Sequence, residues 1–335
     1  MGFNCLLSSR SLIRISGAVS HEFLQGLFTN DLRLLVPGGG IWGCFLYHTG
    51  RVMCDAYLYQ PTEIKSSAQT AIVIDVHSDM IDILQEHLLE MRMRKKLQIE
   101  NISKDFAILA STGDCANTVS SDNSNNNNNN NNNPSSSLCV VESFQDPRSF
   151  AFPTPLHKSL IPAASIPSTT SSTKTITITR TDPEWHYNTF LYTAGVGEGP
   201  EIFRHAKTLP FEANTDFLRG VSFHKGCYVG QELTHRTHIM LVTRKRTVPF
   251  RLQVTGKRSV SKGEALFVDG QKVGEVLAVC GDVGLALLRL RYVTADPQLL
   301  RLQDGVVVEV RIPAWWDARE VRKMMMMSSS SSSSS

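Results

Sequence analysis

The sequence changes character after Arg246, and this change limits how the chain can fold. Before that residue, helix-like and strand-like stretches alternate, which is typical of an α+β domain. After it, short β-rich runs punctuated by glycine follow one another, and Asp269-Gly270 between two of them is typical of a tight hairpin turn. At 335 residues the chain is longer than one usual domain. We therefore predict a large α+β domain over residues 1–246, a small β-barrel over 247–322 and a disordered tail over 323–335.

Two low-complexity stretches interrupt the large domain. One is an asparagine tract at 125–133 flanked by serines, and the other is a Ser/Thr/Pro-rich stretch at 162–175. Neither can bury enough apolar surface to offset the entropy that a chain loses when it becomes ordered. We predict disordered insertions over about 116–137 and 162–174, and we assign no chemistry to them.

The remainder of the large domain alternates between predicted helices and strands. Apolar residues recur at helical spacing from Ser20 to Leu35, where Ser20 is a good N-cap, and again from Ser78 to Lys95. Thr49-Gly50 separates two strand-like runs and predicts a hairpin. The predicted strands are 11–16, 42–48, 51–59, 71–76, 106–111, 137–144 and 174–179, and a third helix is predicted over 183–194.

Bulk composition excludes several classes of protein. Hydrophobic residues at 41% and charged residues at 19% are sufficient for the core of a soluble globular protein. The net charge of +3 is too small to mark a nucleic-acid-binding domain, and no apolar run approaches the roughly 18 residues that cross a bilayer. The seven cysteines are an odd number without CxxC spacing, which indicates a reducing compartment. We expect neither a direct nucleic-acid partner nor a membrane.

The first residues of the chain allow two interpretations. Arg10 and Arg14 occur there without any acidic residue, as in a mitochondrial targeting segment. The alternation from residue 11 to residue 16 is nevertheless that of a strand, and it leads straight into helical sequence. We interpret the start of the chain as the first strand of the fold and identify no clear presequence.

The densest functional signal is the stretch 223–232, in which Gly226 and Gly230 flank a Cys-Tyr pair. Glycine allows close backbone approach, and an ammonium such as that of Lys225 beside a thiol lowers the pKa of the thiol. A helix that begins just after the pair acts in the same direction. Cys227 is therefore a candidate thiolate, which is the form that binds iron. The same spacing also fits an inert, buried cysteine in a glycine-rich turn, and spacing alone leaves both interpretations open.

A resemblance to a known family bears on this choice. The run Lys225-Gly-Cys-Tyr-Val-Gly-Gln-Glu232 resembles the signature of one branch of the glycine-cleavage T-protein superfamily, which contains iron-sulfur cluster assembly factors and bacterial tRNA-modifying folate-binding proteins. Agreement extends to residues 23–31, Gly50-Arg51 with Asp55, Asp146-Pro-Arg148, 195–199, 209–212 and 244–246. These motifs cover nearly the whole chain outside the insertions and the tail. Within this superfamily the chain resembles the mitochondrial assembly factors most. Its large domain is interrupted by Asn and Ser homopolymers of a kind typical of eukaryotes, whereas the bacterial relatives are compact.

The resemblance implies an aminomethyltransferase-like, folate-binding fold with a central channel and a C-terminal β-barrel. It implies a non-catalytic role in the mitochondrial matrix, in the late-stage maturation of [4Fe-4S] client enzymes together with an A-type scaffold protein. Cys227 would bind a [2Fe-2S] or [4Fe-4S] cluster transiently and share it with that partner. The signature residues around the thiol would be Lys225, Gly226, Tyr228, Gly230, Gln231 and Glu232. A role as an RNA-modification accessory, as in the bacterial relatives, differs mainly in the client protein.

The same resemblance makes tetrahydrofolate a candidate ligand of the channel. The candidate binding residues are Asn30, Asp55, Glu198, Glu212 and Arg236. A pterin ring needs a buried carboxylate as acceptor, and Glu198 or Glu212 fits this role. The alternative function is a tetrahydrofolate-dependent aminomethyl or one-carbon transferase that uses Asp55 as acid or base. Such enzymes commonly carry paired acidic residues in the second hairpin strand, whereas this chain has Cys54-Asp55, so we expect no enzyme.

Two polar patterns near Cys227 have weaker interpretations. His235 and His238 lie three residues apart, but this spacing matches no common zinc pattern, and we expect packing or surface roles. Arg236 fits either an ion pair with Glu232 at helical spacing or a contact with an anionic ligand.

Four further motifs are interpreted as structural. Arg244-Lys-Arg246 fits a solvated turn at the domain junction, and Trp315-Trp316 fits an apolar anchor for the barrel. Asn30-Asp31 is expected to orient the loop after the first helix or to face the channel. Gly195-Val-Gly-Glu-Gly199 follows helical sequence, so it is not interpreted as a dinucleotide-binding motif.

Overall fold

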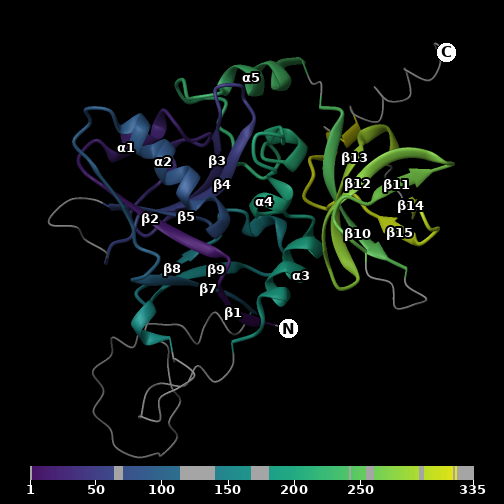
Figure 1. Ribbon diagram of the computed structural model, residues 1–335, viewed down its shortest axis with the longest axis horizontal. Helices are drawn as coiled ribbons and strands as arrows, with labels where there is room; N and C mark the ends of the chain where they lie inside the picture. Colours follow the sequence, from purple (N-terminus) through teal and green to yellow (C-terminus); the bar gives the residue numbers. More distant parts are fainter. Residues whose placement is uncertain are drawn as a thin grey trace, which may run out of the picture.

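The computed structural model describes residues 2–63, 71–113, 140–166, 181–240, 243–253, 260–293, 298–319 and 321–322. Two β-sheets make up the larger part of the molecule, and a closed barrel stands beside them (Figure 1). Strands and helices alternate in the larger part, as the predicted α+β class requires. The first predicted insertion, the predicted strand 174–179 and the predicted tail lie outside the described residues, as do residues 167–174 of the second insertion.

The first sheet has five antiparallel strands. In spatial order they are β3 (Gly40–Leu46), β4 (Val52–Tyr59), β5 (Ala71–His77), β2 (Arg10–Ser16) and β6 (Gln98–Asn101). β3 and β4 form the predicted hairpin, and Gly50 in its turn has a φ of +78°. Every residue of β4 is buried, because other elements cover both faces of the sheet.

Two helices, α1 (Ser20–Gln25) and α2 (Ile81–Arg92), cover the outer face of this sheet (Figure 1). Their fully buried Leu24 and Leu84 share an apolar core with Ile13 and Ile72 of the strands. α2 is shorter than the predicted 78–95, because a 3-10 turn precedes it and a positive φ at Met93 ends it.

α1 is also much shorter than the predicted helix 20–35. Ser20 is the first helical residue rather than the N-cap, and its hydroxyl donates to the carbonyl of Gly17. The chain leaves the helix because Thr29 is drawn onto β3, where its N–H donates to the carbonyl of Cys44 at 3.0 Å. A 3-10 turn at Leu32–Leu34 follows. The apolar periodicity of residues 20–35 therefore extends past the end of the helix, because apolar side chains that follow α1 are also buried beside the sheet.

The second sheet has the order β1-β7-β9-β8. Its strands are β1 (Phe3–Leu7), β7 (Phe106–Thr112), β9 (Leu156–Pro162) and β8 (Glu142–Gln145). β1 was not predicted, so the predicted strand 11–16 is the second strand and not the first. The prediction that the second insertion begins at residue 162 was wrong, because Pro162 ends β9 and the N–H of Ala163 donates to the carbonyl of Asp105.

The β-barrel closes in the order β10-β13-β12-β11-β14-β15. Its strands are β10 (Lys245–Leu252), β13 (Val283–Arg289), β12 (Gln271–Cys280), β11 (Ala265–Val268), β14 (Gln298–Leu302) and β15 (Val307–Val310). The predicted turn at Asp269-Gly270 is confirmed, and both residues have positive φ, at 48° and 75°. Sequence analysis missed β14. No helix within the described ranges is long and apolar enough to span a membrane.

Three further helices are α3 (Glu184–Ala194), α4 (Gly199–Ile202) and α5 (Gln231–Met240). α3 and α4 lie between the sheets and the barrel (Figure 1). The indole N–H of Trp315 donates to the carbonyl of Ala194 at 2.7 Å, which confirms the predicted anchor. Arg246 is buried and forms an ion pair with Asp216 at 2.6 Å. The prediction of a solvated turn at 244–246 was therefore wrong for Arg246.

Candidate functional site

The signature loop, residues 223–230, is held against the tip of the β3–β4 hairpin by a close glycine contact. Gly230 has a φ of +78°, and a Cβ at this position would lie 2.3 Å from the carbonyl oxygen of Tyr47. Across the contact, a Cβ on Gly50 would lie 2.6 Å from the Cβ of Leu233. Because neither position has room for a side chain, the backbone of the loop is fixed to a rigid sheet.

Within the loop, two neighbouring side chains differ in exposure: Tyr228 is buried and Cys227 is exposed. Tyr228 is 5% exposed, and burial raises the pKa of its hydroxyl to about 12. Cys227, just before it, is exposed. Gly226 has open space where a Cβ would stand, so it makes no close approach. The interpretation of Cys227 as an inert buried cysteine is therefore wrong, and Tyr228 is the anchor that allows the thiol to face solvent.

Lys225 is a second anchor of the loop and does not serve as the thiol's counter-ion. Its ammonium donates to the carbonyls of Gln25, Phe28 and Asn30 at 2.7, 2.6 and 2.9 Å. Burial lowers the pKa of Lys225 to about 8, so the ammonium form with its three donors is present at neutral pH. The ammonium thus joins the signature loop to the backbone that follows α1. This is the segment that was predicted to be helical but is not.

The remaining signature residues begin α5. The predicted helix start at Gln231 is confirmed, and its side-chain oxygen accepts from the N–H of Tyr228 at 3.2 Å. Glu232 and Arg236 are both exposed, and no ion pair joins these two described side chains, so the predicted pair is absent. His238 stacks on Phe223 with ring centroids 3.7 Å apart, a packing contact between α5 and the loop.

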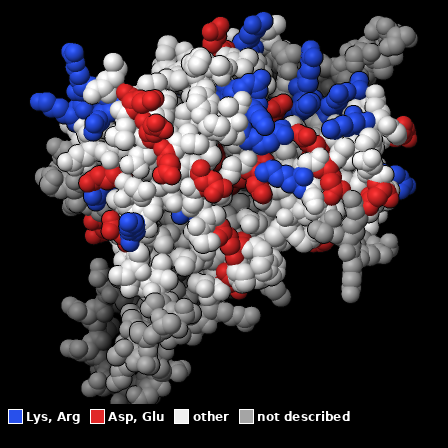
Figure 2. All heavy atoms as spheres, viewed as in Figure 1, with Lys and Arg blue, Asp and Glu red and all other residues white. Residues whose placement is uncertain are grey.

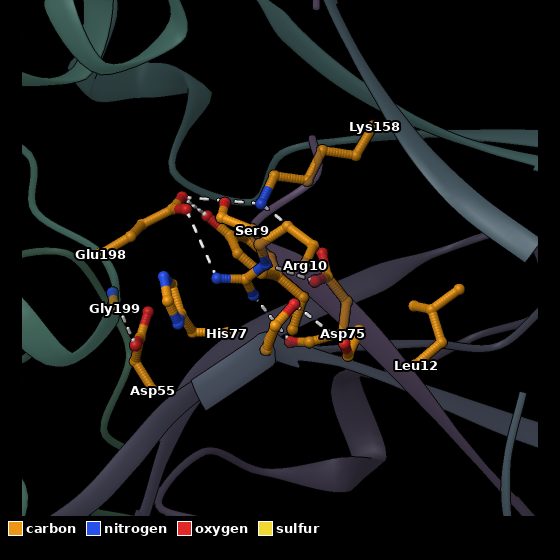
Figure 3. Close-up of polar contacts among 12 residues, drawn as sticks. Ser9, Arg10, Leu12, Asp55, Asp75, His77, Lys158, Glu198 and Gly199 are labelled. Atoms are coloured by element: carbon orange, nitrogen blue, oxygen red, sulfur yellow. Dashed lines mark hydrogen bonds and ion pairs between the residues drawn. The ribbon is translucent and has the colours of Figure 1, made fainter. Parts of the chain in front are cut away.

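A second polar region lies between the two sheets. We call it the polar centre, and it consists of Arg10, Asp55, Asp75, Asp146, Arg148, Lys158 and Glu198. Glu198 directly precedes α4, and its carboxylate faces Lys158 and Arg10 (Figure 3). Its carboxylate accepts from Tyr187 at 2.8 Å and also from Arg148 and Tyr57.

Two more cations face the same carboxylate. The Lys158 ammonium of β9 lies 3.6 Å from Glu198 and 3.6 Å from Asp75, as Figure 3 shows. The Nε–H of Arg10 donates to the Asp75 carboxylate at 2.5 Å, and its terminal nitrogen Nη1 lies 3.7 Å from Glu198. These residues come from β2, β5, β9 and the segment before α4, so the polar centre ties the two sheets together.

Burial and neighbouring charges shift the pKa values of residues in the polar centre. Burial alone would raise the pKa of Glu198, but Lys158, Arg148 and Arg10 together hold it well below its ordinary value. Burial lowers the pKa of Lys158, opposed by Glu198 and Asp75. Burial raises the pKa of Asp55, opposed chiefly by Arg10. Glu198 is therefore a carboxylate neutralised by the chain's own cations.

The structure brings together only two of the five candidate folate residues. Asp55 accepts from the N–H of Gly199 at 3.0 Å and so lies beside Glu198 (Figure 3). The other three have different partners: the Asn30 amide donates to the carbonyls of Trp42 and Arg219, Glu212 accepts from the N–H of Leu209, and Arg236 is exposed on α5. Asn30 thus orients the loop after α1, one of its two predicted roles.

A pterin requires a buried carboxylate as acceptor, and donors of the chain itself already occupy part of this pair. Glu198 already accepts from three donors of the chain, and Asp55, which is 1% exposed, accepts from Gly199 and from the Trp42 indole at 3.4 Å. All three donors to Glu198 share its Oε1, whereas its Oε2 faces Arg10 at 3.7 Å. Tetrahydrofolate binding stays a prediction, and we derive no chemical step through it.

Sequence analysis missed Lys158, Arg10 and Asp75 as members of a polar site. Asp75 had a visible signal, because it is the only charged residue in the apolar run 71–76. Arg10 was considered as part of a targeting segment, but it is buried at the start of β2. Lys158 stands in an ordinary strand sequence, and only the packing of the two sheets identifies it.

The paired sheets and the barrel define the class of this protein, which has an aminomethyltransferase-like fold. The glycine cleavage system aminomethyltransferase T from Bartonella henselae superposes with a TM-score of 0.69 at 15% identity, covering 94% of this chain and 86% of that chain. The likeness shows the fold alone. Residues 244–318 match the family described as CAF17, C-terminal beta-barrel domain.

Sequence relatives identify the family more closely. The chain is 31% identical over 324 residues to the human protein named iron-sulfur cluster assembly factor IBA57, mitochondrial, covering 92% of this chain and 84% of the relative. The homologue named for the same factor in Dictyostelium discoideum is 28% identical over 317 residues, covering 88% and 73%. The chain belongs to the IBA57 family of iron-sulfur cluster assembly factors.

Proposed function

We propose that this chain assists the late-stage maturation of mitochondrial [4Fe-4S] proteins, by sharing a cluster between Cys227 and an A-type scaffold protein. The observation that carries the proposal is the position of Cys227. Its thiol is exposed, while Tyr228 and Lys225 on either side anchor the loop in the protein. A thiol that is fixed in place and open to solvent can complete the ligand set of a cluster that another protein presents.

The names of the relatives support this role. They are called iron-sulfur cluster assembly factors and mitochondrial. We infer iron-sulfur cluster assembly in mitochondria for this chain, with the matrix as the compartment. The cluster is cargo rather than a resident cofactor, in either the [2Fe-2S] or the [4Fe-4S] form. The clients would be enzymes that need a [4Fe-4S] cluster.

The chemistry assigned to Cys227 is ligand exchange. The thiol loses its proton to solvent, and the thiolate sulfur forms a bond to an iron atom of the cluster while one ligand of the scaffold protein leaves that iron. On delivery, a thiolate of the acceptor protein forms a bond to that iron and the bond to Cys227 breaks. Neither step changes the oxidation state of sulfur or iron, so the ligand exchange itself requires no redox partner.

The transferase alternative has less support from the geometry. Asp55 would have to act as acid or base on a bound substrate, but it is 1% exposed and its oxygens accept from Gly199 and Trp42. Release of formaldehyde from a methylamine substrate by the purified protein would favour the transferase over the assembly factor.

The decisive experiment is anaerobic spectroscopy of the purified protein with an A-type scaffold, iron and sulfide. We expect the wild-type mixture to develop a cluster chromophore that the mixture with Cys227→Ser lacks. Cys280→Ser is the matched control, because Cys280 is a half-buried thiol on the barrel strand β12. Equal spectra for wild type and Cys227→Ser would show that this thiol is not a ligand. In cells, unchanged aconitase-type activity with Cys227→Ala would contradict the role of the thiol.

A further inference from the structure

The helix that follows the signature loop has almost no buried face. Thr234 is the one buried residue of the ten in α5. The large apolar side chains of Ile239 and Met240 at its end are 76% and 57% exposed. A surface helix is normally stabilised by an apolar stripe packed on the core, and exposed apolar side chains on such a helix indicate a surface that another molecule covers.

The same region is rich in exposed positive charge. Arg236 lies on α5, and four more exposed basic residues lie at the adjoining end of the barrel: Arg244, Lys245, Arg289 and Arg291. Lys245 and Arg289 are register partners on β10 and β13, so they are neighbours. Figure 2 shows basic side chains gathered along the edge where α5 lies and across the nearby end of the barrel. α5 itself carries a single acidic residue, Glu232.

α5 and the end of the barrel form one continuous surface because both contact Phe211. The ring of His238 on α5 lies 6.4 Å from the Phe211 ring, centroid to centroid. Arg246 in β10 donates to the carbonyl of Phe211 at 3.0 Å and is locked by its ion pair with Asp216. The basic residues of the barrel are therefore held in a constant position relative to the helix.

This surface adjoins Cys227, which lies four residues before the first residue of α5. A ten-residue helix is about 15 Å long, and one partner buries roughly 800 Å² in a stable interface, so a partner seated on α5 also has to reach beyond the helix, as far as the two strand ends. A protein that brings a cluster to Cys227 would therefore also cover α5.

We propose that the α5 surface, made of Arg236, Ile239, Met240, Arg244, Lys245, Arg289 and Arg291, docks an acidic face of the scaffold protein that shares the cluster with Cys227. The inference rests on the proposed function and names the chemistry of its partner. Five cations favour an acidic partner, and the apolar end of α5 favours a protein over a nucleic acid. α5 has no Phe, Tyr or Trp on which a base could stack.

The test is a matched pair of charge reversals in the full chain. The first variant combines Arg236→Glu with Arg289→Glu on the α5 surface. The control combines Arg94→Glu with Lys96→Glu, two exposed basic residues after α2 that change the net charge equally. The dissociation constant for a purified A-type scaffold is measured by calorimetry at two salt concentrations, and thermal unfolding checks that both variants are folded.

We expect the α5 variant to weaken scaffold binding about tenfold or more and to reduce its salt dependence, while the control stays within about twofold of wild type. Wild-type affinity in the α5 variant, with the cluster still lost in Cys227→Ser, would overturn the docking surface and leave the proposed function intact. Failure of wild type itself to bind the scaffold or form a cluster would overturn both. Loss of RNA binding instead of scaffold binding in the α5 variant would reassign the surface and overturn the proposal.

Discussion

The signature loop and the polar centre belong to the same α+β part of the molecule, but solvent reaches their key groups to very different degrees. Cys227 of the loop is exposed, and the residues beside it are the anchors. Glu198 of the polar centre has a side chain only 8% exposed, and its neighbours are its partners. One region exposes a thiol on an anchored loop, whereas the other uses its charged groups to hold two sheets together.

The two regions also differ in what they offer to another molecule. The chain shares its fold with an aminomethyltransferase, and the polar centre lies between the two sheets of that fold. In this chain Arg148, Lys158 and Arg10 neutralise the central carboxylate. The thiol of Cys227 in the outer loop, in contrast, is open to solvent. The following predictions test this division, in order of decreasing expected effect.

Glu198→Gln should be the most damaging change. It removes the charge that compensates Arg148, Lys158 and Arg10 in a buried site, and breaking such a buried network costs about 3–5 kcal/mol of unfolding free energy. Urea unfolding followed by circular dichroism measures the loss. Glu232→Gln, on the exposed face of α5, is the control and should stay within about 0.5 kcal/mol of wild type. A loss below about 1 kcal/mol would mean that the polar centre does not stabilise the fold.

The two glycines of the signature loop should respond differently to alanine. Gly230→Ala places a Cβ 2.3 Å from a backbone oxygen at a positive φ, so we expect a loss of about 2–3 kcal/mol and impaired cluster formation. Gly226→Ala meets open space and should change stability by less than about 0.5 kcal/mol. The same two assays, unfolding and chromophore formation, apply to both variants. Equal behaviour of the pair would contradict the described hairpin contact.

Low pH should reduce the contribution that Glu198 makes to the free energy of unfolding. Its pKa in the folded chain is held below the ordinary value of 4.5, so its stabilisation is complete above that pH and is lost as the pH falls toward the lower, folded value. The stability difference between wild type and Glu198→Gln should therefore shrink by about 1.4 kcal/mol per pH unit below 4.5. Unfolding curves from pH 7 to pH 3 measure it, and a pH-independent difference would contradict the ionised state of Glu198.

Asp55→Asn should have the smallest effect. The amide oxygen of Asn keeps an acceptor for the N–H of Gly199, and burial, which raises the pKa of Asp55, already makes its charge less favourable than that of an exposed carboxylate. We expect a change of less than about 1 kcal/mol in stability and no change in cluster formation with the scaffold. Loss of function in a folded Asp55→Asn protein would favour the transferase alternative.

Local sequence signals were sufficient to predict turns, where a single residue determines the backbone conformation. Gly50 and Asp269-Gly270 mark turns that the structure contains, because positive φ values are accessible to glycine and to few other residues. The apolar run after Ser20 was misleading, since Thr29 bonds to β3 and ends the helix. A side chain buried by a distant strand and one buried by its own helix produce the same pattern in the sequence.

The sequence by itself determined the α+β class, the β-rich C-terminal part and the motif around Cys227. Only the tertiary structure decided that Lys225 binds backbone carbonyls and that Cys227 faces solvent. It also decided that Lys158 from β9 meets Glu198 from the segment before α4. The physical reason is that turns and periodicity depend on neighbouring residues, whereas burial and charge pairing depend on which distant strands the fold brings together.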